Sequence, residues 1–278
     1  MSSASGLGYE GTTVVLTGGA SGLGEAAARI LGEMGAIVHI ADIAEPKVPC
    51  ASYTPVDLAD PASVRKAAEK LKAVGPVDYL FPIAGIPPHL RGPLDCFLVN
   101  YAGTRQFTEA LLPQVRDGGA IGLISSTAAR AWQSHIAEHL ELSRESDPDV
   151  LRKFFADHPE RLRDGYSTSK ELLIVWIQQW APELAQQRRI RINCIAPCPI
   201  DTAFMAMTAE KLGSEFMNSY PYPLLGRMPT GEEQAWSLLL LSSPLNASVT
   251  GSVLFTDQGY AGGLLTGSLQ PATYRPAQ

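Results

Sequence analysis

The chain has 278 residues and a formal net charge of −6, with 22 lysines and arginines against 28 aspartates and glutamates. This acidic balance argues against nucleic acid as the main partner, because binding to phosphates requires clustered lysine and arginine. Hydrophobic residues make up 45% of the chain and charged residues 18%, so a sizeable core is possible and wholesale disorder is excluded.

Patterns typical of strands and of helices alternate along the whole chain. Short apolar or β-branched runs predict strands at 12–17, 36–41, 77–83, 120–126, 190–196 and 252–256. Helical spacing and capping residues predict helices at 22–34, 61–74, 94–112 and 166–185, and over 235–241 after a capping box at Thr230 and Glu233. Such alternation implies an α/β fold, a doubly wound parallel sheet with helices on both faces. We expect one domain over residues 1–278.

Neither a membrane span nor a secretory signal is predicted. The longest apolar run in a predicted helix, Leu172–Ile177, has six residues, whereas a bilayer span needs about 20. The first eight residues are small and polar, unlike the charged and then apolar pattern of a signal peptide. We therefore expect a soluble, cytoplasmic protein.

One stretch, 132–164, interrupts the alternation. It carries many charges and three histidines (His135, His139 and His158), while its sparse apolar residues keep helical spacing. We interpret it as an inserted pair of short helices with a solvated, histidine-bearing face, because nothing supplies the carboxylate geometry of a metal site. The four cysteines are too scattered for a disulfide framework, and we expect them to be small buried apolar residues. No metal is predicted.

The segment Thr17–Gly24, with the sequence TGGASGLG, follows a predicted strand and opens a predicted helix. In that context glycines let the backbone approach a dinucleotide pyrophosphate, whose charge is met by N–H groups at the helix N-terminus. Asp42, about 20 residues further on, ends the second strand, where a carboxylate accepts hydrogen bonds from the adenosine ribose. It would repel the 2′-phosphate of NADP, and its neighbours Ala41, Ile43 and Ala44 include no arginine. The predicted cofactor is NAD.

Tyr166 and Lys170 are four residues apart in the predicted helix 166–185, and therefore share one face of it. A phenol has a pKa of about 10 and is a poor base at neutral pH. A nearby ammonium favours the phenolate, so the pair can exchange a proton with an alcohol or a carbonyl group. The pair lies downstream of the dinucleotide turn and of a predicted strand ending in Ser125 and Ser126.

Together these motifs resemble the short-chain dehydrogenase/reductase family, and the resemblance covers nearly the whole chain. The family's TGxxxGxG motif corresponds to 17–24 here, and its acid/base tyrosine and its lysine correspond to Tyr166 and Lys170. The resemblance identifies Ser126 as the catalytic serine. It also identifies Asn100, in Val-Asn-Tyr-Ala-Gly, as the structural and catalytic asparagine.

The resemblance implies a Rossmann-type fold and further contacts with the cofactor. Asp57, in Val-Asp-Leu, corresponds to the family's adenine-side aspartate, and 197–202 corresponds to the PGxIxT segment that meets the nicotinamide carboxamide. The residues predicted to contact the cofactor are Gly18, Ser21, Gly22, Leu23, Gly24, Asp42, Asp57, Leu58, Ala84, Gly85, Tyr166, Lys170, Pro197, Ile200 and Thr202.

The sequence departs from the family pattern at three places. The NNAG segment reads Pro-Ile-Ala-Gly at 82–85, so the asparagine side-chain contacts are absent, and the glycine of PGxIxT is Cys198. Ser126 and Tyr166 are 40 residues apart, further than in ordinary members, because the insertion 132–164 precedes the tyrosine. With the Val-Asn-Tyr-x-Gly segment, these departures make the chain similar to the bacterial 3α-hydroxysteroid dehydrogenase/carbonyl reductase branch.

The resemblance implies an NAD-dependent alcohol dehydrogenase or carbonyl reductase that interconverts a secondary alcohol and its ketone. Tyr166 is expected to take the hydroxyl proton, while Ser126 orients the substrate oxygen and stabilises its charge. Lys170 is expected to bind the nicotinamide ribose and lower the pKa of Tyr166, and Asn100 to hold the backbone and a water on the proton path. A nicotinamide-binding sensor without turnover is the alternative, which the presence of all four residues disfavours.

The segment 203–225 is expected to close the substrate pocket. Its large apolar residues are Phe204, Met205, Met207, Leu212, Phe216, Met217, Tyr220 and Tyr222. Such side chains suit a bulky apolar ring system, although half of them could instead pack the segment onto the body. The predicted substrate is a cyclic, hydrophobic alcohol or ketone of the steroid or terpenoid kind. A small cyclic alcohol or a dihydrodiol is the nearest alternative.

Assembly follows from the position of the insertion. Members of the family usually form tetramers or dimers through paired helices, one of which bears the tyrosine and the lysine. Here the insertion 132–164 would occupy the surface where a partner helix docks, whereas the apolar runs 235–241 and 253–255 and the tail from Tyr260 offer another interface. Because closed two-fold association is the commonest assembly, we predict a homodimer through this C-terminal edge, with a homotetramer as the alternative.

Overall fold

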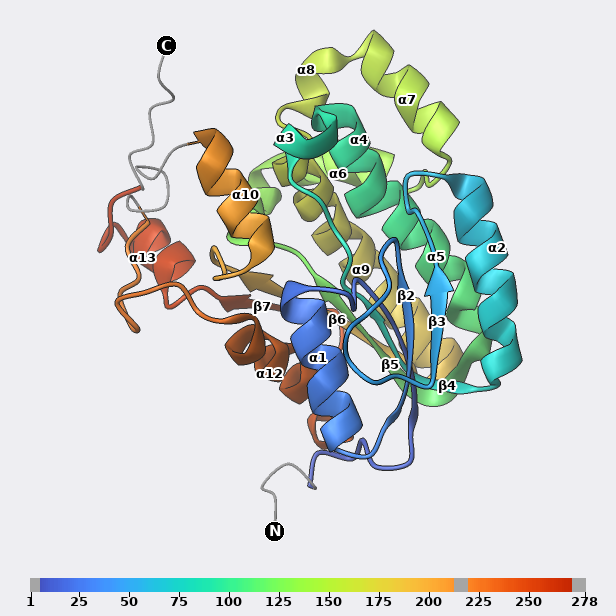
Figure 1. The fold of residues 1–278 in the computed structure, drawn as a ribbon. Coiled ribbons are helices and arrows are strands. Elements are labelled where there is room, and N and C mark those ends of the chain that lie inside the picture. The colour runs from blue at the N-terminus through green and yellow to red at the C-terminus, as the bar shows by residue number, and fades with distance from the viewer. Residues whose placement is uncertain (1–5, 213–219, 272–278) are drawn as a thin grey trace.

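Seven parallel strands form one sheet in the computed structural model, which describes residues 6–212 and 220–271 (Figure 1). The strands are β1 (Thr13–Thr17), β2 (Ile37–Asp42), β3 (Ser52–Pro55), β4 (Val77–Pro82), β5 (Val115–Ile124), β6 (Arg191–Pro197) and β7 (Val253–Thr256). Their order across the sheet is β3-β2-β1-β4-β5-β6-β7, so the direction of the connections reverses between β1 and β4. In such sheets ligands bind outside the carboxyl ends of the strands at this reversal. The predicted Rossmann-type α/β fold is confirmed.

The central strands consist of residues that suit burial on both faces. Every residue of β6 is buried, and β1 is buried from Val14 to Thr17. Because doubly covered parallel strands are continuous apolar runs, the sequence predicts these two to within one residue. It does not predict β3, whose four residues Ser-Tyr-Thr-Pro form a short strand at the edge of the sheet. It also places the start of β5 five residues too late, because Arg-Asp-Gly-Gly is typical of a turn.

Helices cover both faces of the sheet (Figure 1). The longer helices are α1 (Gly22–Glu33), α2 (Pro61–Leu71), α5 (Thr104–Leu111), α7 (Pro148–Asp157), α9 (Tyr166–Arg188), α10 (Ala203–Leu212) and α12 (Gly231–Ser242). The shorter segments are η1 (Lys72–Val74), α3 (Pro88–Arg91), α4 (Pro93–Phe97), η2 (Leu98–Gly103), η3 (Leu112–Gln114), η4 (Thr127–Ala129), η5 (Trp132–His135), α6 (Ile136–Leu142), α8 (Pro159–Leu162), η6 (Pro244–Asn246) and α13 (Tyr260–Thr266). One core layer joins α1 and α12 to the sheet, and the other joins α2, α5 and α9 to it. None of the helices described is long and apolar enough to cross a membrane.

The insertion 132–164 is part of the second core layer rather than a cover that faces solvent. It forms η5, α6, α7 and α8, not a single pair of helices. Leu151 and Phe155 of α7 are buried, and the Phe155 ring packs edge-on against Phe97 of α4, with ring centres 4.7 Å apart. Leu151 and Phe155 therefore anchor the insertion to the body of the domain.

Candidate active site

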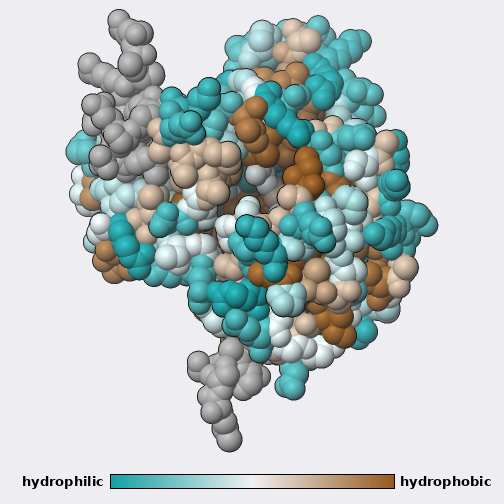
Figure 2. All heavy atoms as spheres, viewed as in Figure 1, coloured by the Kyte–Doolittle hydropathy of each residue, from teal (hydrophilic) through white to brown (hydrophobic). Residues whose placement is uncertain are grey.

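A cavity of about 880 Å³ opens at the carboxyl ends of the central strands, and Figure 2 shows it as a hollow bordered by apolar residues. Every residue predicted to contact the cofactor lines this cavity, as do Ser126, Tyr166 and Lys170. Asn100 is fully buried and lies behind the wall at Gly85, where a Cβ would come within 3.1 Å of its Oδ1 atom. The fold therefore gathers residues from seven separate segments of the chain in one place.

The glycine-rich turn joins β1 to α1 in close contact with the end of β4. Gly18 has a φ of +78°, and a Cβ there would lie 2.8 Å from backbone atoms of Ala84. At Gly24 a Cβ would lie 2.0 Å from the carbonyl oxygen of Gly18. Ser21 precedes α1 without making a side-chain cap, so N–H groups of the first helical turn remain available to an anion in the cavity.

Two aspartates lie in the cavity wall beyond this turn. Asp42 ends β2, and its carboxylate accepts hydrogen bonds from the N–H groups of Ala20 at 2.9 Å and Ala44 at 3.0 Å. These backbone donors fix the orientation of the carboxylate. Asp57 forms an ion pair with Arg91 at the end of α3, with 3.3 Å between Oδ2 and Nη1.

Tyr166 and Lys170 lie one turn apart at the start of α9, and both line the cavity. The ammonium of Lys170 lies 5.8 Å from the centre of the Tyr166 ring and donates a 2.8 Å hydrogen bond to the carbonyl of Ile124. Ser126 follows β5, and its hydroxyl lies near enough to the Tyr166 phenol to act on the pKa of that phenol. The end of β5 and the first turn of α9 thus bring three polar side chains together.

Burial dominates the acidity of these groups. It raises the pKa of Tyr166 to about 12, although the nearby hydroxyl of Ser126 acts in the opposite direction. It lowers the pKa of Lys170 to about 8. The protein's own groups therefore do not lower the pKa of Tyr166, contrary to expectation, because desolvation of the phenolate outweighs the favourable contacts.

Asn100 lies in the π-helical turn η2, within the range 94–112 where the sequence predicts one continuous helix. Its Oδ1 accepts a 2.8 Å hydrogen bond from the N–H of Ile86, and its Nδ2 donates a 2.9 Å hydrogen bond to the carbonyl of Ile86. One buried amide therefore satisfies both backbone groups of a wall residue. π-Helical turns within helices are frequent at functional sites.

The wall segment 86–91 was missed by the sequence analysis. It includes α3, which begins at two adjacent prolines, Pro87 and Pro88, and its residues His89 and Arg91 also line the cavity. The proline pair one residue after Ala84-Gly85 was the available signal, because it predicts a change of chain direction beside the glycine-rich turn.

Only some of the large apolar side chains predicted in the segment 203–225 line the cavity. The predicted residues that line the cavity are Phe204, Met205, Met207 and Tyr220. The Phe204 ring lies 6.2 Å from that of Tyr166, which places an apolar wall beside the phenol. Tyr222 instead packs against Tyr220, with ring centres 5.0 Å apart. The side chain of Leu212 and the residues Phe216 and Met217 lie outside the described part of the chain.

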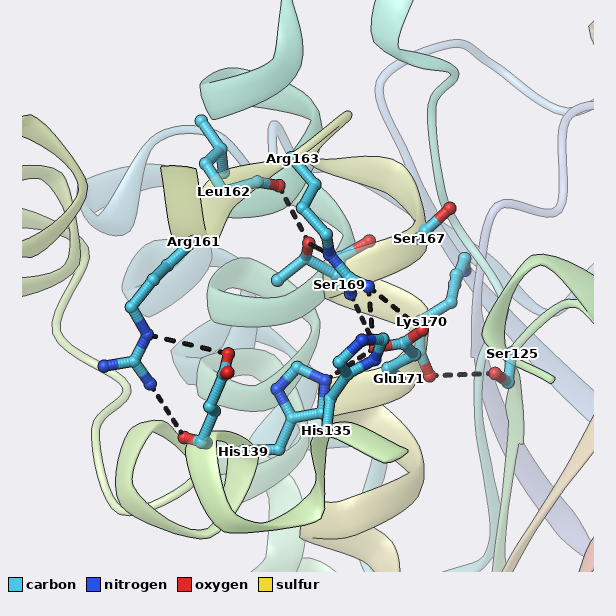
Figure 3. Close-up of polar contacts among 12 residues, drawn as sticks. Ser125, His135, His139, Arg161, Leu162, Arg163, Ser167, Ser169, Lys170 and Glu171 are labelled. Atoms are coloured by element: carbon cyan, nitrogen blue, oxygen red, sulfur yellow. Dashed lines mark hydrogen bonds and ion pairs between the residues drawn. The ribbon is translucent and has the colours of Figure 1, made fainter. Parts of the chain in front are cut away.

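A second polar cluster, which the sequence analysis also missed, lies beside the first turns of α9 (Figure 3). The prediction that the histidines of the insertion face solvent is wrong for His139, which is 2% exposed. It holds only for His158, whose side chain is half exposed. The missing carboxylate is Glu171, whose Oε2 lies 2.7 Å from His139 Nε2 and 3.0 Å from His135 Nδ1. The four-residue spacing of His135 and His139 was the available signal, because it places both on one helical face.

Known proteins resemble this chain along most of its length. Residues 12–138 match a family model described as short chain dehydrogenase, and residues 156–261 match one described as enoyl-(acyl carrier protein) reductase. The coniferyl-alcohol dehydrogenase of Pseudomonas sp. is 33% identical over 205 residues, which cover 73% of this chain and 78% of that protein. The momilactone A synthase of Oryza sativa subsp. japonica is 27% identical over 263 residues, which cover 90% of this chain and 89% of that protein.

A solved structure shares the fold. The 3-alpha-hydroxysteroid dehydrogenase from Pseudomonas sp. B-0831, complexed with NADH, superimposes with a TM-score of 0.78. The two chains are 23% identical, and the match covers 93% of this chain and 100% of that one. At this identity the likeness is one of architecture.

Proposed function

The chain belongs to the short-chain dehydrogenase/reductase family of oxidoreductases, and from that premise we propose that it uses NAD to interconvert a hydrophobic cyclic alcohol and its ketone. The observation that carries the proposal is the convergence of Ser126, Tyr166 and Lys170 on one cavity. The glycine-rich turn and the apolar side chains at the start of α10 line the same cavity.

The residues around the glycine-rich turn fit a dinucleotide. Gly18 and Gly24 leave no room for side chains, and the uncapped N–H groups of α1 would bind the pyrophosphate. Lys170 would hold the nicotinamide ribose, and Ile200 and Thr202 would lie beside the carboxamide. When bound, the nicotinamide supplies or takes up the hydride.

The choice of NAD over NADP rests on Asp42. Its carboxylate ends β2 in the cavity wall and is held there by two backbone N–H groups. In this orientation it would accept hydrogen bonds from the ribose hydroxyls and repel a 2′-phosphate. The 3-alpha-hydroxysteroid dehydrogenase of similar fold was solved as a complex with NADH, which supports the choice of NAD.

Proton transfer is the part of the reaction that belongs to the protein. In the oxidative direction Tyr166 takes the hydroxyl proton of the substrate, and in the reductive direction it returns one. Ser126 donates a hydrogen bond to the substrate oxygen and holds it near the phenol. Burial raises the pKa of Tyr166 to about 12, so forming the phenolate would require positive charge nearby. We assign that role to Lys170, whose ammonium lies 5.8 Å from the centre of the Tyr166 ring. Asn100 holds the wall at Ile86 and would position a water on the proton path.

The substrate class follows from the apolar side chains that the start of α10 contributes to the cavity wall. Phe204, Met205 and Met207 face the cavity, and side chains of this kind suit a bulky, irregular apolar ring system. The names of two similar proteins also support a ring-containing substrate, because one is a dehydrogenase of coniferyl alcohol and the other of a 3α-hydroxysteroid. The coniferyl-alcohol relative also favours a second candidate substrate, an aromatic compound whose side-chain primary alcohol is oxidised to an aldehyde rather than to a ketone.

One substrate panel tests the proposal. Absorbance of NADH at 340 nm would be followed in both directions with 3α-hydroxysteroids, terpenoid alcohols, small cyclic alcohols, a dihydrodiol and coniferyl alcohol, each with NAD and with NADP. Turnover of the bulky cyclic alcohols with NAD is the expected result. Turnover of coniferyl alcohol alone would favour the second candidate. Tight binding of NADH with no turnover of any compound would favour a sensor and overturn the proposal.

A homodimer through the C-terminal edge belongs to the same proposal. The strand β7 ends the sheet, and exposed leucines lie on and around it, at Leu240, Leu245, Leu254 and Leu265. The helix α6 packs against α9, where helix pairing would otherwise occur. Sedimentation equilibrium is expected to give a dimer for the wild type and a monomer for Leu254→Glu. A wild-type tetramer would contradict this assembly.

A further inference from the structure

Three side chains of the insertion 132–164 converge on one buried carboxylate of α9, that of Glu171 (Figure 3). The Glu171 side chain is 2% exposed, and its Oε2 lies 2.5 Å from Arg163 Nη2, 2.7 Å from His139 Nε2 and 3.0 Å from His135 Nδ1. His135 lies near the beginning of the insertion and Arg163 at its end. Glu171 therefore ties both ends of the insertion to the same helix.

Glu171 directly follows Lys170 and lies five residues after Tyr166. Successive helical residues are rotated by about 100°, so Glu171 points toward the insertion while Tyr166 and Lys170 line the cavity. On another side of the same turn, the Ser125 hydroxyl donates a 2.9 Å hydrogen bond to the carbonyl of Lys170. The start of α9 is thus held from two directions, by the end of β5 and by the insertion.

The backbone at Arg163 is strained in a way that its side chain explains. Its φ is +52° and its ψ −124°, a combination that normally requires glycine. Such a conformation persists in another residue only where the surroundings over-determine it. The Arg163 guanidinium contacts Glu171 and also donates a 3.1 Å hydrogen bond from Nε to Thr168 Oγ1, so it binds two residues of α9.

The same three residues could hold a metal ion, but Arg163 argues for a different role. Ligand atoms of His135, His139 and Glu171 all lie within 4.8 Å of one another. The guanidinium of Arg163, however, already lies 2.5 Å from the Glu171 carboxylate and 3.2 Å from His135 Nδ1. A fixed cation thus neutralises the carboxylate, and a divalent ion would have to displace it.

We propose that Glu171 and Arg163 form a clamp through which the insertion positions Tyr166 and Lys170 relative to Ser126. Glu171 and Arg163 are positioning residues, because they act on the proton-transfer groups through the backbone of α9. The inference rests on the proposed function, since it concerns the geometry of that same reaction. It also assigns a role to the insertion. Residues 132–163 do not line the cavity, and on this proposal they anchor α9 instead.

The clamp depends on both the charge and the shape of the Arg163 side chain. Removing the fixed cation of a buried ion pair leaves the carboxylate charge poorly compensated, so without Arg163 the position of Glu171 would depend on His135 and His139 alone. A planar guanidinium with several fixed donors can bind Glu171 and Thr168 together, whereas a lysine ammonium binds as a point charge. Arg163→Lys should therefore retain part of the clamp, and Arg163→Gly should abolish it.

The test compares these two variants by steady-state kinetics. Arg163→Gly relieves the backbone strain but removes the guanidinium, and kcat is expected to fall by roughly 10–100-fold, the cost of misplacing reacting groups by about 1 Å. The substrate KM is expected to change little. The NADH dissociation constant should rise much less than kcat falls, because Lys170 is only one of many cofactor contacts, and Arg163→Lys should recover part of kcat. If Arg163 only shapes the turn, Arg163→Gly will match or exceed the wild type in both stability and kcat, which would overturn the proposal.

Two further variants complete the test. The double variant Arg163→Gly/Glu171→Gln removes the uncompensated charge, so it should fold well and still show the low kcat. The matched control is Arg161→Gln, because Arg161 lies in the same insertion (Figure 3) but forms its ion pairs with Glu138 and Glu141 of α6. Its kcat should equal that of the wild type, and an equal loss in the control would contradict a specific clamp.

Two measurements separate this inference from its premise and from a metal site. Amide hydrogen exchange of residues 166–171 should be faster in Arg163→Gly than in Arg161→Gln, a result that does not depend on any substrate. Unchanged exchange would refute the clamp even if the dehydrogenase activity is established, whereas faster exchange without any turnover would refute only the proposed function. Calorimetric titration of untagged, chelator-treated protein with zinc chloride should show no site. Zinc binding that is lost in His139→Ala would replace the clamp with a metal site.

Discussion

Phe155 tests most directly whether the insertion is part of the core. Its side chain is 3% exposed, and its ring packs against those of Phe97 at 4.7 Å and Phe154 at 5.3 Å. Truncating a buried phenylalanine to alanine costs about 3–5 kcal/mol, because burial is lost and a cavity remains. Edge-on ring pairs contribute about 0.5–1.5 kcal/mol beyond burial, which places the expected loss toward the upper end of that range.

Urea unfolding at neutral pH, followed by circular dichroism and tryptophan fluorescence, measures this loss. Phe155→Ala should lower the midpoint at an unchanged m-value, since the fold and its exposed surface stay the same. The matched control is Val150→Ala in the same helix, where the side chain is 49% exposed and the expected change is within about 0.5 kcal/mol. If Phe155→Ala also changes the free energy of unfolding by less than about 1 kcal/mol, the insertion is a detachable cover and the reasoning fails.

Three further predictions concern the site. Tyr166→Phe should lower turnover by roughly 10²–10⁴-fold and leave the NADH dissociation constant nearly unchanged, because only a positioned proton carrier is lost; substantial residual activity would contradict this. Asp42→Ala should narrow the preference in kcat/KM for NAD over NADP, chiefly by weakening the use of NAD, and equal use of both by the wild type would show that Asp42 is misinterpreted. Burial raises the pKa of Glu171, but hydrogen bonds from His139 and Arg163 outweigh it and hold that pKa below its usual value of 4.5. The stability from this shift is therefore present above pH 4.5 and lost below it, so acid unfolding curves should show a steeper loss for the wild type than for Glu171→Gln; equal slopes would contradict the assignment.

Sequence patterns predicted the parts of the fold that local chemistry determines. Buried parallel strands such as β6 are continuous apolar runs. The helix α2 begins at Pro61 and is capped by Asp60, whose side chain accepts a hydrogen bond from the N–H of Ala62. The same patterns could not predict β3, because a polar four-residue strand at an edge has no burial signal. Its pairing with β2 depends on where the neighbouring chain lies.

The residues of the candidate site also fall into those that local sequence patterns predict and those that only tertiary packing brings together. Gly18, Tyr166 and Lys170 were predicted because their function requires a fixed spacing within one turn or one helix face. The pairing of His139 with Glu171 was not, because 32 residues separate them and only the packing of α6 on α9 brings them together. The predicted solvated histidine face failed for this reason, since a charged stretch does not reveal which of its side chains meets a buried partner.

The position of the insertion explains why such a partner is needed. Ser126 lies just after β5 and Tyr166 begins α9, and the insertion 132–164 makes up most of the chain between them. Lengthening a connection costs little closure entropy, so the fold tolerates the extra residues, but a long connection does not by itself fix where the following helix starts. The start of α9 must still stay within hydrogen-bonding reach of Ser126. A buried carboxylate one residue beyond Lys170, bound by both ends of the insertion, restores the rigidity that a short connection would have provided.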